Sequence, residues 1–176
     1  MIDKEIDALI REVVDFPKKG ISFKDITPLL MDKNISDKII LEFKSRIMDL
    51  DIDAVVGIES RGFLYGFLLA NKLGVPFIPI RKSGKLPGET IKYKYDLEYG
   101  SSEVEIHKDD IKKDWNVLIH DDLLATGGTA CAAAELINLS GANVAGFTFI
   151  VSLDFLSPNK KLFKYSSNIF NLVEYK

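Results

Sequence analysis

Two adjacent carboxylates and a short loop of threonines and glycines make Val117–Thr129 the stretch of this sequence best suited to chemistry. The glycines let the backbone approach a ligand and turn its N–H groups inward, and Thr126 and Thr129 can donate hydroxyl hydrogen bonds to phosphate oxygens. Asp121 and Asp122 would repel a phosphate, but they suit vicinal hydroxyls or the water shell of a metal ion. The stretch therefore predicts a site for a phosphorylated sugar.

The surroundings of this loop favour that interpretation. An apolar strand precedes the acids, and an alanine-rich helix over Ala130–Leu139 follows, so the partial positive charge of the helix N-terminus would face the ligand. The alternative is an ordinary strand-to-helix connection in which Asp122 or Thr126 caps the helix.

Basic residues after two other expected strands could attract the same anion. Arg61 follows one strand, and Arg81 and Lys82, with Lys85 shortly after them, follow the next. The alternative is that these cations are solvated or serve only as ion-pair partners. Their position after strands, in parallel with the acids, favours a role at the site.

Strands that alternate with helices indicate an α/β fold with a mostly parallel twisted sheet and helices on both faces. The expected strands are 53–58, 75–80, 115–119 and 144–153. Ligands of such sheets bind beyond the carboxyl ends of the strands, where the acids, the loop and the cations all fall. The chain has no internal repeat and no linker, so we expect a single domain over residues 1–176.

The N-terminal part is expected to hold two amphipathic helices, 3–14 and 36–49, the second capped by Ser36. Between them, the segment 15–28 contains proline and glycine and carries Phe23 in a loop or short strand. Phe23 could plug the core, or it could stack on a planar ligand.

Alternation of apolar and polar residues at 90–95 and again at 103–107 predicts a β-hairpin, which would form a lid over the site. Glu98 and Tyr99 near its base are candidate acid/base and phosphate-binding groups. The C-terminal tail, 158–176, is expected to close the fold by packing on the sheet or against a partner.

Composition excludes several classes of protein. The net charge of −3 provides no basic field for nucleic acid, and the single cysteine, Cys131, excludes an internal disulfide and a cysteine-rich zinc site. Acidic residues interrupt the N-terminus where a signal peptide would be apolar, and no uncharged run approaches membrane-spanning length. We therefore expect a cytoplasmic protein with no nucleic-acid or membrane partner.

Four ordered motifs, spread over about residues 5 to 155, make the sequence resemble the type I phosphoribosyltransferases and, within that family, the members that act on adenine. The motifs are Asp15–Pro28, Glu59–Phe63, Arg81–Gly100 and Val117–Thr129. His120 departs from the family pattern, which usually has an aliphatic residue there.

The resemblance implies that the site binds phosphoribosyl pyrophosphate, with an N-terminal base-binding segment (the hood) and a hairpin lid around it. The 5′-phosphate would be held by Ala125, Thr126, Gly127, Gly128 and Thr129. Asp121 and Asp122 would bind the ribose hydroxyls, near a Mg²⁺ cofactor that is bound mainly through the substrate and has no direct protein ligand. Pyrophosphate would be held by Arg61, Arg81, Lys82, Lys85 and Tyr99. Glu98, Arg61 and Tyr99 would be the catalytic residues, with Glu98 as the acid/base, and the loop Glu59–Arg61 often contains a non-proline cis peptide.

Adenine would stack on Phe23 beside the backbone of Ser22 and Lys24, with Leu123 also at the base site. A 6-oxopurine presents a carbonyl that suits a lysine donor, and the segment 142–158 contains no lysine, which argues against hypoxanthine or guanine. The implied reaction of purine salvage converts adenine and phosphoribosyl pyrophosphate into AMP and pyrophosphate. The alternatives are a phosphoribosyltransferase for another purine and a regulatory domain that senses phosphoribosyl pyrophosphate. Family members are commonly homodimers, so we expect a homodimer.

Overall fold

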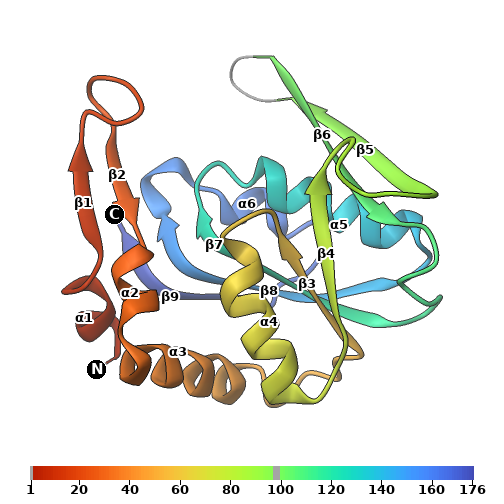
Figure 1. Ribbon diagram of the computed structural model, residues 1–176, viewed down its shortest axis with the longest axis horizontal. Helices are drawn as coiled ribbons and strands as arrows, with labels where there is room; N and C mark the ends of the chain where they lie inside the picture. The colour runs from red at the N-terminus through yellow and green to blue at the C-terminus, as the bar shows by residue number, and fades with distance from the viewer. Residues whose placement is uncertain (1, 97–99) are drawn as a thin grey trace.

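A seven-stranded sheet of order β5-β6-β4-β3-β7-β8-β9 forms the centre of the molecule (Figure 1). The computed structural model describes residues 2–96 and 100–176. The strands of this sheet are β3 (Ala54–Ile58), β4 (Phe77–Lys82), β5 (Thr90–Asp96), β6 (Ser101–His107), β7 (Asn116–Leu124), β8 (Asn143–Leu153) and β9 (Ile169–Tyr175). Strands β4, β3, β7, β8 and β9 pair in parallel, and the β5–β6 hairpin adds to β4 in antiparallel fashion. The mostly parallel α/β fold predicted from the sequence is confirmed.

Helices cover both faces of the sheet, as a parallel sheet requires. Helices α3 (Lys33–Arg46) and α4 (Gly62–Leu73) lie on one face, and α5 (Gly128–Leu139) lies on the other (Figure 1). Val55 belongs to the core under α3 and α4, whereas the next residue, Val56, belongs to the core under α5. The short helices are α1 (Ile2–Asp7), α2 (Thr27–Met31), the 3₁₀ turn η1 (Asp154–Leu156) and α6 (Asn159–Leu162).

The N-terminal segment forms a separate two-stranded antiparallel sheet, with β1 (Arg11–Val14) paired to β2 (Ser22–Asp25). The prediction of one helix over 3–14 is therefore wrong beyond Asp7. A short amphipathic helix is marginal by itself, and β-branched residues such as Val13 favour a strand once a partner strand is available. Figure 1 shows this sheet and the β5–β6 hairpin rising on opposite sides of the carboxyl edge of the central sheet.

The helix expected at 36–49 begins three residues earlier, at Lys33, and ends at Arg46. Asp32 caps it, because its side chain accepts hydrogen bonds from the backbone N–H groups of Asn34 and Ile35 at 2.9 and 3.1 Å. The predicted cap, Ser36, lies inside the helix and donates its hydroxyl to the carbonyl of Leu29 instead.

The C-terminal tail packs on the sheet, as predicted, because β9 pairs in parallel with β8 at the sheet edge. Within residues 2–96 and 100–176, none of the helices is long and apolar enough to cross a membrane.

Candidate functional site

The carboxyl ends of β3, β4 and β7 surround a cavity of about 360 Å³. The cavity is lined by residues from the sheet, the hairpin and α5: Ile58, Glu59, Ser60, Arg61, Ile80, Arg81, Lys82, Tyr95, Val104, Asp121, Asp122, Leu123 and Thr129. A smaller cavity of about 90 Å³ lies along the loop from Leu124 to Ala130 and shares Asp121, Leu123 and Thr129 with the first. The structure thus brings together the acids, the threonine loop and most of the cations that the sequence analysis identified.

Strand β7 continues to Leu124, five residues beyond the predicted end at Ile119, so Asp121 and Asp122 lie within the strand. Pairing with β8 carries the strand forward, since Asp121 lies opposite Phe149 and Leu123 opposite Val151. The two acids therefore sit on a rigid element and not on a loop.

Asp122 is buried, Asp121 is half-buried, and the two carboxyls lie close to each other. Oδ1 of Asp121 accepts a hydrogen bond from the backbone N–H of Asp122 at 2.9 Å. Gly62 makes room for this group, because a Cβ atom at that position would lie 2.8 Å from Oδ1 of Asp121. Burial raises the pKa of both carboxyls, and the charge of Asp122 raises that of Asp121 further. Such a pair favours a ligand that donates hydrogen bonds or brings positive charge.

Arg61 connects the paired acids to the hood. Its Nε lies 2.6 Å from Oδ2 of Asp122, and its guanidinium carbon lies 5.2 Å from the ring centroid of Phe23. Phe23 is half-buried, belongs to neither hydrophobic core and meets Phe16 edge-on at 5.3 Å. The alternative that Phe23 plugs the core is therefore not supported, and the ring lies on strand β2 against Arg61, which lines the cavity.

A third carboxylate, Glu59, contacts Arg81, Lys82 and Lys85, the cations at and just after the end of β4. It accepts hydrogen bonds from Nζ of Lys85 at 2.6 Å, from the backbone N–H of Lys82 at 3.0 Å and from Nε of Arg81 at 3.3 Å. Burial alone would raise the pKa of Glu59, but these hydrogen bonds outweigh it and lower the pKa to about 2. No role for Glu59 was predicted from the sequence. Its position directly after a buried strand, which was used to predict a role for Arg61, also pointed to Glu59.

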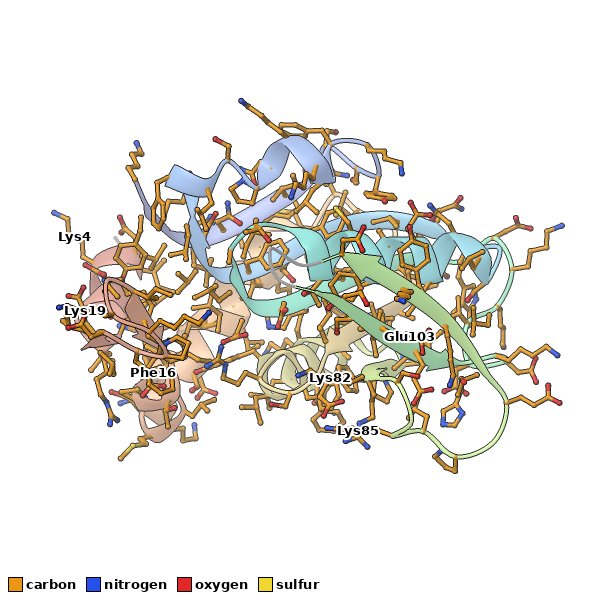
Figure 2. All side chains as sticks on the ribbon, turned by 90° about the horizontal axis from the view of Figure 1, so that it is seen from above. Lys4, Phe16, Lys19, Lys82, Lys85 and Glu103 are labelled. Carbon is orange, nitrogen blue, oxygen red and sulfur yellow. The ribbon has the colours of Figure 1, made fainter. Side chains whose placement is uncertain are left out.

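Lys82 and Lys85 lie toward the middle of the molecule, away from the N-terminal segment. Figure 2 shows Lys82 and Lys85 near each other beside β4, with Phe16 and Lys19 at the far end on the N-terminal segment. The peptide bond between Glu59 and Ser60 is cis, as the family resemblance implies.

The glycine loop leaves the N-terminus of α5 without a side-chain cap. Gly127, at the N-cap position, has a φ of 80°, and no side chain accepts a hydrogen bond from the first turn. The alternative in which Asp122 or Thr126 caps the helix is therefore wrong. The first N–H groups of the helix are left for a ligand, and the hydroxyl of Tyr95 on the hairpin lies 3.2 Å from Oγ1 of Thr129.

The other predicted site residues have different surroundings. Ser22 and Lys24 lie on β2, on either side of Phe23, and the side chains of both hydrogen-bond Glu12. Leu123 lines both cavities. Glu98 and Tyr99 lie outside the residues that the structure describes.

His120 points into the core beneath α3. It is fully buried, its Nδ1 lies 3.0 Å from Oγ1 of Thr148, and its ring meets Phe43 edge-on at 5.6 Å. Burial lowers the pKa of His120 to about 3, so the ring is neutral at physiological pH. This departure from the family pattern therefore lies in the core, and His120 lines neither cavity of the site.

A parallel sheet whose carboxyl edge joins paired acids, an uncapped glycine loop and a cluster of cations defines a protein that binds phosphorylated sugars. Comparison with known proteins narrows this class. The family model described as "Phosphoribosyl transferase domain" matches residues 29–173. Adenine phosphoribosyltransferase of Alkaliphilus metalliredigens is 53% identical over 161 residues, which cover 92% of this chain and 95% of that protein.

Solved structures agree with the sequence relatives. The crystal structure of adenine phosphoribosyltransferase from Thermoanaerobacter pseudethanolicus superposes with a TM-score of 0.95 at 46% identity, covering 99% of this chain and 100% of that one. The enzyme of Saccharomyces cerevisiae, solved with an imino-altritol bisphosphate and adenine, gives a TM-score of 0.90 at 41% identity, covering 97% and 98% of the two chains. The chain belongs to the phosphoribosyltransferase family, among the adenine phosphoribosyltransferases.

Proposed function

We propose that this protein transfers the 5-phosphoribosyl group from phosphoribosyl pyrophosphate to adenine, giving AMP and pyrophosphate. The observation that carries the proposal is the position of Arg61, which contacts Asp122 of the sugar site and the ring of Phe23 in the hood. A planar base on Phe23 would therefore lie next to a sugar held by the acids. The structure of the yeast relative, solved with adenine and a bisphosphate together, supports this assignment.

The site residues divide among the parts of the substrates. In our proposal the glycine loop, Ala125–Thr129, holds the 5′-phosphate, and Asp121 and Asp122 accept hydrogen bonds from the ribose hydroxyls. The pyrophosphate is held by Arg61 and Lys82. Arg81 and Lys85 also bind it, after they leave their ion pairs with Glu59. These assignments are supported by the position of the acids, Arg61, Arg81, Lys82 and Thr129 around one cavity at the carboxyl ends of three strands. The rest of the glycine loop lines the smaller adjoining cavity, and Lys85 contacts Glu59, which lines the first.

The base is held in the hood in this proposal. Phe23 stacks on adenine, the backbone groups of Ser22 and Lys24 read its edge, and Leu123 contacts it from the sheet. Glu98 as the acid/base and Tyr99 as a pyrophosphate ligand stay predictions from the family resemblance.

This set of site residues suits a nucleophilic substitution at the anomeric carbon of the ribose. Adenine nitrogen attacks that carbon as the bond to pyrophosphate breaks, and pyrophosphate leaves with the bonding electrons. The proton lost by the attacking nitrogen goes to Glu98, the acid/base residue of this proposal. Positive charge develops on the sugar, so a site that aligns the two reactants and stabilises the leaving anion needs no covalent nucleophile. The hairpin, linked to the glycine loop through Tyr95, is placed to limit the access of water to the activated sugar.

The paired acids also suit the Mg²⁺ ion that the family implies. Among the described residues no group of three or more His, Cys, Asp or Glu side chains is arranged to hold a metal by itself. Mg²⁺ prefers a few carboxylates together with phosphate oxygens and water. The pKa values of Asp121 and Asp122 are raised, and a nearby cation would favour the ionised form of both carboxyls. When bound, the ion neutralises charge on the leaving group.

We also propose a homodimer formed through α4. Leu64, Phe67 and Leu68 share one face of this helix and remain 44%, 56% and 44% exposed. An apolar face of this kind marks an interface. Sedimentation velocity should give a dimer for the wild type and a monomer for Phe67→Glu; a monomeric wild type contradicts the proposal.

The cytoplasmic location and the single domain stay predictions from the sequence.

The function is tested by supplying the protein with Mg²⁺, phosphoribosyl pyrophosphate and one base at a time. Chromatography of the products should show AMP from adenine and no nucleotide from hypoxanthine or guanine. A nucleotide from another purine alone would reassign the base. Saturable binding of phosphoribosyl pyrophosphate without any nucleotide would indicate a sensor domain instead.

A further inference from the structure

A buried glutamate outside the cavity organises the loop between β4 and β5. Glu105 lies on β6, with its Cα opposite Arg81 of β4 and Lys92 of β5, and its side chain is only 2% exposed. A carboxylate so deeply buried requires several donors to offset the loss of hydration.

Backbone groups of the loop supply two of the donors, and Thr90 and Lys92 of β5 supply a hydrogen bond and a positive charge, with Nζ of Lys92 3.7 Å from Oε2. Oε1 of Glu105 accepts hydrogen bonds from the backbone N–H groups of Lys85 and Leu86, both at 2.8 Å. Burial alone would raise the pKa of the carboxyl, but these donors, with the nearby N–H of Gly84, lower it. The hydroxyl of Thr90 donates to Oε2 at 3.3 Å. Successive backbone N–H groups that converge in this way form an anion-binding concavity, and here a carboxylate of the same chain occupies it.

The backbone held by Glu105 carries the side chain of Lys85 to the cavity. Nζ of Lys85 lies 2.6 Å from Glu59, which lines the cavity. NH1 of Arg81 donates to the carbonyl of Lys85 at 3.3 Å, so the same stretch of backbone also supports the second cation. A change at Glu105 would therefore be felt at the pyrophosphate end of the site and not at the hood.

We propose that Glu105 is a positioning residue for pyrophosphate binding and that it acts through Lys85. The proposal rests on the proposed function. It assigns Glu105 no contact with either substrate: its carboxylate fixes the loop backbone, and Lys85 makes the contact.

A double-mutant cycle separates this role from general stabilisation of the fold. The variants are Glu105→Gln, Lys85→Ala and the two combined, with Glu103→Gln as the matched control, since Glu103 is a half-buried glutamate on the same strand. The readouts are the Kd of pyrophosphate by calorimetry, the KM values of phosphoribosyl pyrophosphate and adenine, and Tm.

Glu105→Gln should weaken pyrophosphate binding by about tenfold, the effect of losing hydrogen bonds to a charged group, and leave the KM of adenine within about twofold. In the Lys85→Ala background the same substitution should weaken pyrophosphate binding much less, by the part that passes through Arg81, and Glu103→Gln should match the wild type. If Glu105→Gln lowers Tm too far for binding to be measured, Glu105→Asp, which keeps the charge on a shorter side chain, should give the same pattern.

Additive losses in the double mutant, or equal losses of adenine and pyrophosphate binding, would overturn the proposal. A wild-type protein that binds neither pyrophosphate nor phosphoribosyl pyrophosphate would instead refute the proposed function. A wild type that binds both, with an unaffected Glu105→Gln, refutes only the role of Glu105.

Discussion

Nε of Arg61 lies 2.6 Å from Oδ2 of Asp122, in an ion pair between a side chain that is 38% exposed and one that is 6% exposed. The pair joins the loop after β3 to the neighbouring strand β7. Burial keeps the pKa of Asp122 raised even though Arg61 opposes that effect, so the arginine compensates the buried charge only in part. A substrate with hydroxyl donors for Asp122 and an anion for Arg61 would supply the hydrogen bonds and the charge that the two side chains do not fully give each other.

Replacing Asp122 by alanine should abolish turnover and leave the fold intact. Arg61 stays partly hydrated when it loses its partner, whereas the ribose hydroxyls lose an acceptor, so we expect AMP formation to fall by at least about 100-fold. Circular dichroism should match the wild type, and Asp109→Ala, at an exposed position, should leave activity unchanged. Full activity in Asp122→Ala would remove the ribose-binding role.

Removal of the Phe23 ring should weaken the binding of adenine and leave the binding of phosphoribosyl pyrophosphate nearly unchanged. Stacking of a base on an aromatic ring contributes about 1–3 kcal/mol, so Phe23→Ala should raise the KM of adenine by about 10- to 100-fold. The KM of phosphoribosyl pyrophosphate should change little. Phe155→Ala, at a phenylalanine that is 62% exposed, is the matched control. An unchanged KM for adenine would exclude Phe23 from the base site.

The contact between the hairpin and the glycine loop predicts a smaller effect. Tyr95→Phe removes one hydroxyl that lies 3.2 Å from Oγ1 of Thr129 and keeps the ring. A neutral hydrogen bond contributes about 0.5–1.5 kcal/mol, so the KM of phosphoribosyl pyrophosphate should rise by about 2- to 10-fold. Tyr93→Phe on the same strand should have no such effect, and equal changes in the two variants would indicate a contribution to stability alone.

The low pKa of Glu59 predicts how stability depends on pH. Because its folded pKa of about 2 lies below the usual 4.5, ionised Glu59 stabilises the fold above pH 4.5, and this contribution is lost as the pH falls toward 2. Glu59→Gln should therefore lower the free energy of unfolding by on the order of 1–3 kcal/mol near neutral pH. The difference from wild type should shrink below pH 4.5.

Urea unfolding at a series of pH values measures this difference. Glu89→Gln, at a glutamate whose side chain is 80% exposed, is the control and should show little difference at any pH. A difference between wild type and Glu59→Gln that stays constant from neutral to acid pH would show that its charge is not what stabilises the loop.

The features that the sequence predicted correctly are those encoded locally. The apolar runs before Glu59 and Asp121, the small residues before α5 and the alternation in the hairpin each identify their element without knowledge of the rest of the chain. The paired acids and the glycine loop predict a phosphorylated sugar by chemistry alone, and the chain belongs to the phosphoribosyltransferase family.

The errors and omissions concern contacts between distant parts of the chain. Strand β1 depends on pairing with β2, which a helical pattern of spacing cannot reveal. Aspartate and serine both cap helices well, and Asp32 and Ser36 are only four residues apart, so the sequence does not distinguish them before the helix is packed. Glu105 has its partners on β4, β5 and the loop between them, and the register that brings them together is set by the whole sheet.

The most direct test of the account is the release of pyrophosphate from phosphoribosyl pyrophosphate, measured with and without adenine in the presence of Mg²⁺. If the protein transfers the sugar to a base held on Phe23, pyrophosphate should appear only when adenine is present, in equal amounts with AMP. Pyrophosphate without adenine, or no AMP when both substrates are supplied, would contradict the account.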